Sequence, residues 1–238
     1  MQDSIARLQA WIEESNNIVF FGGAGVSTES GIPDFRSTDG LYHMKYAYPP
    51  ETILSHRFFI NRTEEFYAFY REKMVHSDAA PNITHIKLQQ LEAQGKVRAV
   101  ITQNIDGLHQ RAGSKEVLEL HGSILRNYCM KCKASYDLDY VLKQEGIPRC
   151  SCGGTIKPDV VLYEEPLEEN VMKEAIRLIS EAKLLLIGGT SLNVYPAAGL
   201  IDYYAGDKLV LINKSVTAYD KRANLLITSS LGDIFSKI

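Results

Sequence analysis

The 238-residue sequence lacks any long hydrophobic run. The longest run near its start, Ile18–Phe21, is far below the roughly 20 apolar residues that a membrane-spanning helix needs. The first residues, Met1–Ser4, have neither the basic region nor the small-residue cleavage pattern of a secretion signal. The sequence also lacks a large excess of charge of one sign, because 26 Lys and Arg nearly balance 29 Asp and Glu. We therefore expect a cytoplasmic protein that binds neither membranes nor nucleic acids directly.

Internal repeats, low-complexity tracts and Gly/Ser-rich linkers are absent as well. The composition, 45% hydrophobic and 23% charged, is ordinary for a globular protein and excludes a disordered or fibrous chain. The length allows one large domain or two unequal ones.

Cysteine is rare, yet its four copies gather in one short stretch, as Cys129 and Cys132 followed by Cys150 and Cys152. Two pairs of thiolates at about this separation are typical of a structural zinc site with four cysteine ligands. Two disulfides are the alternative, but they fit a secreted protein. The second pair is unusually tight, and Gly153 and Gly154 after it would supply the backbone freedom it needs. We expect one structural zinc ion per chain.

Hydrophobic patterning predicts alternating strands and helices. Helices are expected over residues 3–14, 82–94 and 168–181. The runs that fit strands are Ile18–Phe21, Val97–Ile101, Val117–Leu120, Val160–Leu162, Leu184–Ile187 and Leu209–Ile212. Most are continuously apolar, as in strands buried on both faces of a parallel sheet. The pattern predicts an α/β fold with a doubly wound, Rossmann-type parallel sheet.

Two segments interrupt this alternation. Residues 38–76 are aromatic and helical in pattern, and residues 126–157 contain the cysteines. We expect residues 1–238 to form a single catalytic unit. Its large Rossmann-type domain would comprise 1–37, 77–125 and 158–238, and 38–76 and 126–157 would form a small helical and zinc-binding lobe. A cleft between two such lobes is the usual place for a ligand.

A glycine-rich turn, Gly23-Ala24-Gly25, follows the first strand, and such turns let backbone amides approach a pyrophosphate. The dehydrogenase fingerprint G-x-G-x-x-G is not completed, because Thr28 stands at the third glycine position. No Gly-Lys-Ser/Thr follows either, which excludes a Walker loop. The turn therefore suggests a nucleotide that is bound by neither of these common motifs.

The wider stretch Gly23–Arg36 (GAGVSTESGIPDFR) closely resembles the signature of the sirtuins, the NAD-dependent protein-lysine deacylases. Three more motifs match that family in order: Thr102–Asp106 (TQNID), Leu120–Gly122 (LHG) and Gly189–Ser191 (GTS), with Asn213 after a later strand. The resemblance spans residues 18–235, little more than a compact bacterial-type catalytic core. One departure is Glu164, which stands where many members have glycine.

The resemblance implies deacetylation of acetyl-lysine in proteins, with NAD consumed as a co-substrate. The products would be free lysine, nicotinamide and O-acetyl-ADP-ribose. His121 would act as the general base, since imidazole titrates close to neutral pH. Asn104 and Asp106 would act with it in the nicotinamide pocket. A hydrogen-bonded core histidine and a helix cap are the simpler structural interpretations of these residues.

The same resemblance implies further contacts. Those with NAD would be made by Gly23, Ala24, Gly25, Thr28, Asp34, Phe35, Arg36, Gln103, Asn104, Ile105, Asp106, His121, Gly189, Thr190, Ser191, Asn213, Asp233 and Ile234. Acetylated proteins would bind as extended peptides along Val160, Val161, Leu162 and Tyr163, opposite Val194.

Tyr67 and Tyr70 would line the acyl pocket. Sirtuins that prefer succinyl- or malonyl-lysine carry Tyr-x-x-Arg there. In this sequence the fourth position is Tyr70, with Arg71 one residue further on. The resemblance therefore implies neutral acyl groups, acetyl first.

Two other functions remain open at this point. An NAD hydrolase or mono-ADP-ribosyltransferase on the same scaffold would release nicotinamide without acyl-lysine, although it would have no use for a peptide groove. A non-catalytic NAD-sensing or zinc-ribbon module would be expected to lack His121 or Asn104, and both are present.

Overall fold

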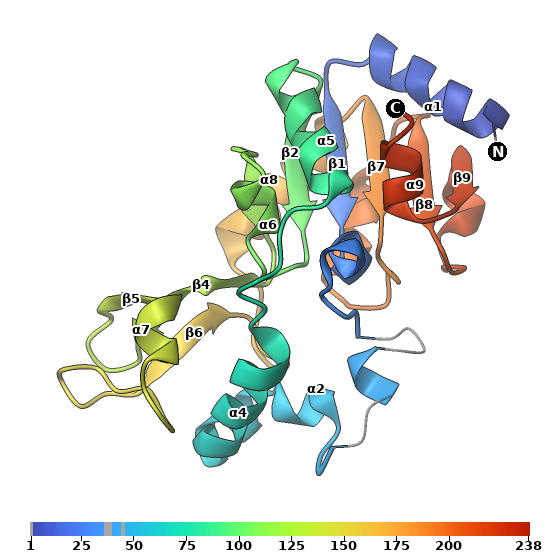
Figure 1. The fold of residues 1–238 in the computed structure, drawn as a ribbon. Helices are drawn as coiled ribbons and strands as arrows, with labels where there is room; N and C mark the ends of the chain where they lie inside the picture. Colours follow the sequence, from blue (N-terminus) through green and yellow to red (C-terminus); the bar gives the residue numbers. More distant parts are fainter. Residues whose placement is uncertain (1, 36–39, 44–45) are drawn as a thin grey trace.

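The computed structural model describes residues 2–35, 40–43 and 46–238. Its centre is a sheet of six parallel strands in the order β3-β2-β1-β7-β8-β9 (Figure 1). The strands are β1 (Ile18–Gly22), β2 (Val97–Thr102), β3 (Val117–Glu119), β7 (Leu184–Gly188), β8 (Leu209–Asn213) and β9 (Leu225–Thr228). Strands β2 and β3 follow β1 on one side of it, whereas β7, β8 and β9 lie in succession on its other side. The direction in which successive strands are added therefore reverses between β1 and β7.

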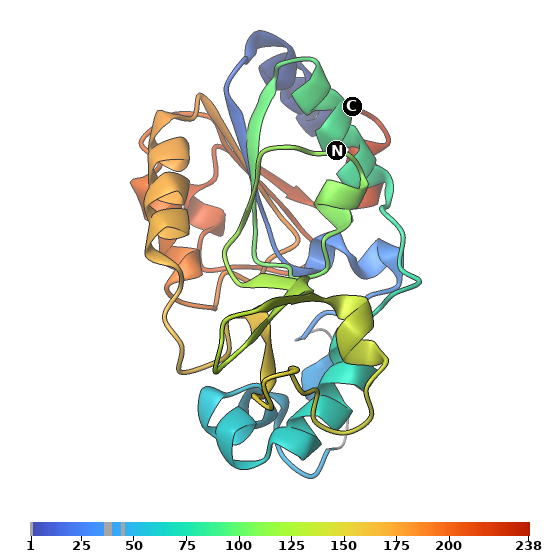
Figure 2. The same ribbon diagram turned by 90° about the vertical axis from the view of Figure 1, so that its left-hand side faces the viewer.

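Helices cover both faces of this sheet (Figure 2). One face packs against α1 (Gln2–Glu14), α5 (Ile83–Ala93) and α9 (Leu231–Phe235). The other packs against α8 (Glu169–Glu181) and the 3-10 helix η5 (Ala197–Tyr203). In β1, Phe20 faces the first layer and Phe21 the second, and both are fully buried. Burial on both faces explains why these strands are continuously apolar, and the doubly wound α/β prediction is confirmed.

A smaller lobe lies beyond the carboxyl ends of the central strands (Figure 1). Its antiparallel sheet has the order β5-β4-β6. The strands are β4 (Gly122–Cys129), β5 (Ser135–Asp137) and β6 (Ile156–Val160), and the helices are α7 (Leu138–Leu142), α2 (Pro50–Ile53), α3 (His56–Asn61), α4 (Thr63–Phe69) and the π-helical turn η4 (Tyr70–Met74). An aromatic core that includes Phe59, Phe66 and Tyr67 joins these helices to the sheet.

Several boundaries differ from the sequence-based prediction. The three predicted helices are present, but the predicted strand Val160–Leu162 is wrong in extent and in sheet. Strand β6 ends at Val160 and pairs antiparallel with β4. The Val161 amide still bonds to the His121 carbonyl, in register with the Gly122–Val160 pair, whereas the Leu162 amide bonds to the Glu165 carboxylate. Strands β4, β5 and β9 were not predicted at all.

The predicted domain boundaries at 125/126 and 157/158 fall within strands. Strand β4 contains the first and β6 contains the second, so both strands pass through the proposed junction between the lobes.

Among the described residues, no helix combines the length and the apolar character needed to cross a membrane.

A buried histidine pair lies where α5 meets the short helix α6 (Leu108–Arg111). The rings of His85 and His109 are 4.7 Å apart between centroids, and both side chains are essentially inaccessible to solvent. Burial lowers the pKa of His85 to about 4 and that of His109 to about 3. A neighbouring charge on Asp106 opposes the shift at His85, whereas His85 reinforces it at His109. Both rings are therefore neutral in the folded protein at neutral pH.

This pair predicts a loss of stability in mild acid. Below an ordinary histidine pKa of about 6.5, both histidines are protonated in the unfolded chain, whereas they stay neutral in the folded chain until the pH is much lower. Lowering the pH from 7 to 5 should reduce the free energy of unfolding by about 2 kcal/mol per histidine. Urea unfolding of the wild type and of His109→Leu at both pH values measures this. The variant should lose less than the wild type, and equal losses would contradict the assignment.

Candidate active site

The site begins at the reversal point of the sheet, where the loops after β1 and β7 meet. The amide of Gly25 donates a 2.8 Å hydrogen bond to the carbonyl of Gly189. A Cβ at Gly25 would lie 2.8 Å from the Gly189 Cα, and Gly189 itself has φ +61°. Any side chain would therefore push the loops apart. Ligands of open α/β sheets bind at this kind of position, outside the carboxyl ends of the strands.

A set of polar side chains joins the two loops to β2 and β8. Gln103 follows β2, and its side-chain amide donates to the Thr190 hydroxyl at 2.9 Å. The Asn213 side chain accepts from the Thr190 amide and donates to the Thr190 carbonyl, at 3.1 and 2.8 Å. Ser191 follows Thr190 and is half-buried. These predicted NAD contacts from three distant segments are thus gathered at one edge of the sheet.

The predicted nicotinamide-pocket residues are linked through Ser27, a residue to which the sequence analysis gave no role. The Asn104 side-chain amide donates to the Ser27 hydroxyl at 3.0 Å. That hydroxyl donates to the Asp106 carboxylate at 2.7 Å, and the other carboxylate oxygen accepts from the Leu108 amide at 2.9 Å. Ser27 is 1% exposed. The last of these bonds ties Asp106 to the first residue of α6, whose N-cap residue is Gly107.

His121 lies in the turn between β3 and β4, half-buried, at the same edge of the sheet. Its Nδ1 is 2.9 Å from the carbonyl oxygen of Gln103. Since a carbonyl only accepts, Nδ1 carries the proton and Nε2 keeps its lone pair in the neutral ring. Burial lowers the pKa of His121, although the bond to Gln103 opposes that shift. The ring is therefore a base that is already neutral at pH 7.

The segment after β1 passes through two 3-10 turns, η1 (Ala24–Val26) and η2 (Thr28–Ser30). The Thr28 hydroxyl donates to the Gly25 carbonyl at 3.1 Å. Further along, Phe35 lies against the small lobe's core and packs edge-on against Tyr42 of the turn η3 (Leu41–His43). The Asp34 carbonyl accepts from the Leu41 amide. Arg36, also a predicted NAD contact, lies outside the described residues.

Other predicted contacts are placed less directly. Ile105 is partly buried against the core of the small lobe, and its carbonyl accepts from Ile124. Asp233 lies exposed in the first turn of α9. Ile234 is fully buried beneath the same helix, in the core of the large sheet. Only the backbone of Ile234 is left for a contact with a nucleotide.

The predicted peptide-binding segment runs directly past His121. The Val161 amide donates to the His121 carbonyl at 2.9 Å, whereas the Val161 carbonyl accepts from no described residue. Val160 and Leu162 are buried, and Tyr163 is 37% exposed. The Tyr163 amide donates to Leu54 and its carbonyl accepts from His56, which fastens the segment to α3. Val194, the predicted residue on the opposite side, is half-buried in the loop before η5.

The predicted acyl-pocket residues lie in the aromatic core of the small lobe. Tyr67 and Tyr70 are both fully buried, and the Tyr67 hydroxyl donates to the Ile156 carbonyl. Burial raises the pKa of both phenols, so both remain neutral. The Arg71 guanidinium donates to the Gln144 carbonyl at 2.8 Å and to the Val141 carbonyl at 3.4 Å.

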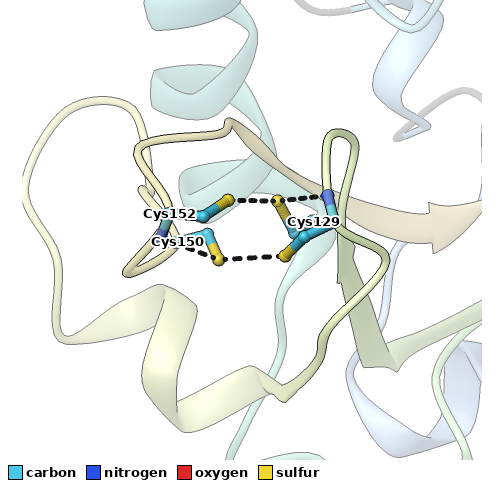
Figure 3. Close-up of side chains that lie close together, drawn as sticks. Cys129, Cys150 and Cys152 are labelled. Atoms are coloured by element: carbon cyan, nitrogen blue, oxygen red, sulfur yellow. Dashed lines mark hydrogen bonds between the residues drawn. The ribbon is translucent and has the colours of Figure 1, made fainter.

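The four cysteines converge at the far end of the small lobe (Figure 3). The sulfurs of Cys129 and Cys152 are 3.5 Å apart, as are those of Cys132 and Cys150. All four sulfurs lie within 4.8 Å of one another. Four thiolates about 2.3 Å from a tetrahedral zinc ion would be roughly 3.8 Å apart, so the set fits one zinc ion. The pairs are far too distant for disulfide bonds.

The tight second pair depends on its glycines, as predicted. Gly153 has φ +78°, and a Cβ on Gly154 would lie 2.6 Å from the Cys129 sulfur. Four protein ligands leave no open coordination position, so a bound zinc ion would be structural. Cys129 is the last residue of β4, whose other end follows His121. The metal site therefore fixes the outer end of the strand that begins next to the candidate base.

The comparisons with known proteins identify one family. Residues 23–196 match the model of the Sir2 family. The "NAD-dependent protein deacetylase" of Clostridium acetobutylicum is 60% identical, over 99% of this chain and 98% of that protein. The protein of the same description from Clostridium perfringens is 57% identical, over 100% of this chain and 99% of that protein.

Solved structures agree. A Sir2 variant with a deacetylated p53 peptide and 3′-O-acetyl-ADP-ribose superimposes with a TM-score of 0.91 at 39% identity, covering 98% of this chain and 96% of that one. A complex of Sir2 with a p53 peptide and NAD+ gives a TM-score of 0.87 at 38% identity, with the same coverage.

The cysteine geometry predicts one zinc ion per chain. Cys129→Ser should abolish metal binding, because it removes a ligand at the buried centre of the cluster. It should also lower the melting temperature. Elemental analysis of the purified proteins measures the zinc content, with Ser151→Ala as a control that changes the same loop without removing a sulfur. A wild-type chain purified with less than half an equivalent of zinc, or a Cys129→Ser variant that keeps a full equivalent, would contradict the assignment.

Proposed function

The chain belongs to the Sir2 family, and we propose that it removes acetyl groups from protein lysines with NAD as co-substrate. The observation that carries this proposal is the placement of His121. Its ring Nδ1 bonds to the carbonyl of Gln103, the neighbour of Asn104 in the polar cluster with Ser27 and Asp106. Its backbone carbonyl accepts from Val161, whose own carbonyl accepts from no described residue. A base, a glycine loop of the kind that binds nucleotides and a segment of the kind that binds extended peptides therefore belong to the same site.

The residues of the cleft divide the chemistry among them. NAD supplies a ribose carbon from which nicotinamide departs and to which the acetyl oxygen adds. His121 accepts a proton from a ribose hydroxyl, since its Nδ1–H is held by the Gln103 carbonyl and its Nε2 is unprotonated. The Asp106 carboxylate, fixed by Ser27 and Leu108, orients the nicotinamide carboxamide. The Phe35 ring keeps water away from the reacting carbon.

The glycine loops and their supporting side chains bind the rest of NAD. Of Gly23, Ala24, Gly25 and Gly189, Ala24 is the residue whose backbone amide has no carbonyl acceptor among the described residues, so this amide would donate to the pyrophosphate. The three glycines leave the backbone without side chains where the nucleotide approaches. Thr28, Gln103, Asn104, Ile105, Thr190, Ser191 and Asn213 line the same edge, and Asp34, Arg36, Asp233 and Ile234 complete the proposed set. All residues, 1–238, act as one catalytic unit, because β4 and β6 join the candidate site at His121 to the small lobe.

Acetylated proteins bind as extended peptides between Val160–Tyr163 and Val194. Main-chain pairing of this kind recognises any extended chain and gives loose sequence preference. Acetyl is the favoured group, because Tyr67 and Tyr70 themselves bring no cation to the acyl pocket. The Arg71 guanidinium lies 5.1 Å from the centre of the Tyr67 ring, but two backbone carbonyls already accept its hydrogen bonds. The acidic net charge of −3 gives no basis for binding nucleic acid.

The cytoplasm is the proposed location. Four unpaired cysteines within 4.8 Å of one another stay reduced there and available to zinc, whereas an oxidising secretory compartment favours disulfides. The rival function, an NAD hydrolase or mono-ADP-ribosyltransferase, gives no role to the segment beside His121, and for that reason we favour deacetylation.

Replacing His121 should abolish turnover without unfolding the protein. We expect His121→Ala to slow deacetylation of an acetyl-lysine peptide by at least about a hundredfold, because it removes a general base. Zinc content and melting temperature should stay near the wild-type values. His76→Ala, which removes a ring whose described bond is to the Lys73 carbonyl, is the control and should change turnover less than twofold. Near-normal activity of His121→Ala would refute the assignment of the base.

The burial of His121 predicts the pH profile. Deacetylation needs the neutral ring, so kcat/KM should fall as the pH drops through the lowered pKa of His121. The acid limb should therefore have an apparent pKa below the 6.5 of an ordinary imidazole. Rates measured from pH 5 to 8 with a peptide that has no other titrating group test this. An acid limb centred above 6.5 would show that a different group is titrating.

A further inference from the structure

A buried ion pair lies directly beneath the proposed peptide-binding segment and has no part in the chemistry described so far. The Lys157 side chain is 5% exposed, and its ammonium group is 3.0 Å from the Glu165 carboxylate. Lysine is almost never buried to this extent unless it is paired, because desolvation of its charge is costly. The burial of this pair therefore indicates a role other than filling space in the core.

Both members of the pair bond to the backbone of the segment. The Lys157 ammonium donates to the Val160 carbonyl at 2.9 Å. The Glu165 carboxylate accepts from the Leu162 amide at 2.9 Å. One ion pair thus holds the residues on either side of Val161, the residue whose amide bonds to His121 and whose carbonyl has no described partner.

A third contact extends the arrangement to α3. The His56 Nδ1 lies 2.8 Å from the second oxygen of Glu165. Burial alone would raise the pKa of Glu165. The bonds from Leu162 and His56 and the charge of Lys157 outweigh it, and they hold the pKa below its usual range. The carboxylate is therefore ionised at neutral pH and can keep all three partners.

The neighbouring acid has a different role. Glu164 adopts φ +75°, and its carboxylate accepts from the Arg57 amide at 3.0 Å, on the surface of α3. It is 44% exposed and contacts neither Lys157 nor the Leu162 amide. Adjacent glutamates thus carry the same charge, but only Glu165 touches the segment from below.

We propose that Lys157 and Glu165 are positioning residues that hold Val160–Leu162 extended, so that an acetylated peptide can add to it as a strand. This inference rests on the proposed deacetylase function. Its chemistry is preorganisation: the ion pair fixes the backbone groups around Val161 before the peptide arrives, which removes an ordering cost from binding. The pair is not catalytic, since neither side chain reaches the reacting atoms.

The test measures KM and kcat for an acetyl-lysine peptide and for NAD in Glu165→Gln. Loss of one charge-assisted contact should raise the peptide KM about tenfold, with the NAD KM changed less than twofold. Glu164→Gln removes the same charge one residue away and should leave the peptide KM within twofold. A blocked single acetyl-lysine has no flanking backbone to pair, so its turnover by Glu165→Gln should fall much less than that of the peptide.

A purely structural role is separated by the double variant Lys157→Met/Glu165→Leu. Replacing both members of a buried pair with apolar residues commonly preserves stability, whereas removing one member does not. We expect the double variant to melt near the wild-type temperature while its peptide KM stays raised. Recovery of the wild-type peptide KM would overturn the proposal, as would an unchanged peptide KM in Glu165→Gln. A wild-type protein without NAD-dependent deacetylation would instead overturn the function on which the proposal rests.

Discussion

The close approach of two glycine loops is the constraint on which the rest of the molecule depends. The 2.8 Å bond between the Gly25 amide and the Gly189 carbonyl closes the edge of the sheet at the point where its strand order reverses. Because the loops touch there, Gln103 and Thr190 come within hydrogen-bond distance across segments far apart in the sequence. The Gln103 carbonyl then fixes the tautomer of His121. The base is thus oriented by the same contact that forms the nucleotide loop.

The small lobe positions the residues that follow His121 in the chain. Strand β4 begins directly after His121 and ends at Cys129, one of the four sulfurs that are positioned to hold zinc. Strand β6 returns beside it and ends at Val160, and the next residue, Val161, bonds to the His121 carbonyl. A structural metal at one end of this sheet therefore helps to position two groups at the other, the histidine and the proposed peptide-binding segment. The aromatic core beneath α3 and α4 supports both strands.

The parts of this arrangement that are encoded by local sequence patterns could be predicted from the sequence. Continuous apolar runs predicted the buried parallel strands, and the spacing of four cysteines predicted the metal site, because both signals come from residues close together in the chain. Ser27, Lys157 and Glu165 were missed. The partners of Ser27 are brought near only by the fold, since Asn104 and Asp106 lie more than seventy positions away. The contacts of Lys157 and Glu165 are local, but they depend on the turn that brings Glu165 back to Leu162, which no hydrophobic pattern marks. The strand predicted over Val160–Leu162 extended too far, since the Leu162 amide bonds to the Glu165 carboxylate at the same turn.

The most direct test of the whole account is the balance of products. The purified protein is incubated with NAD and an acetyl-lysine peptide, beside a control without peptide, and mass spectrometry follows every product. We predict one nicotinamide and one O-acetyl-ADP-ribose for each lysine freed, and almost no nicotinamide in the control. Nicotinamide released at the same rate without peptide would show an NAD hydrolase and would contradict the peptide-binding role of the segment beside His121.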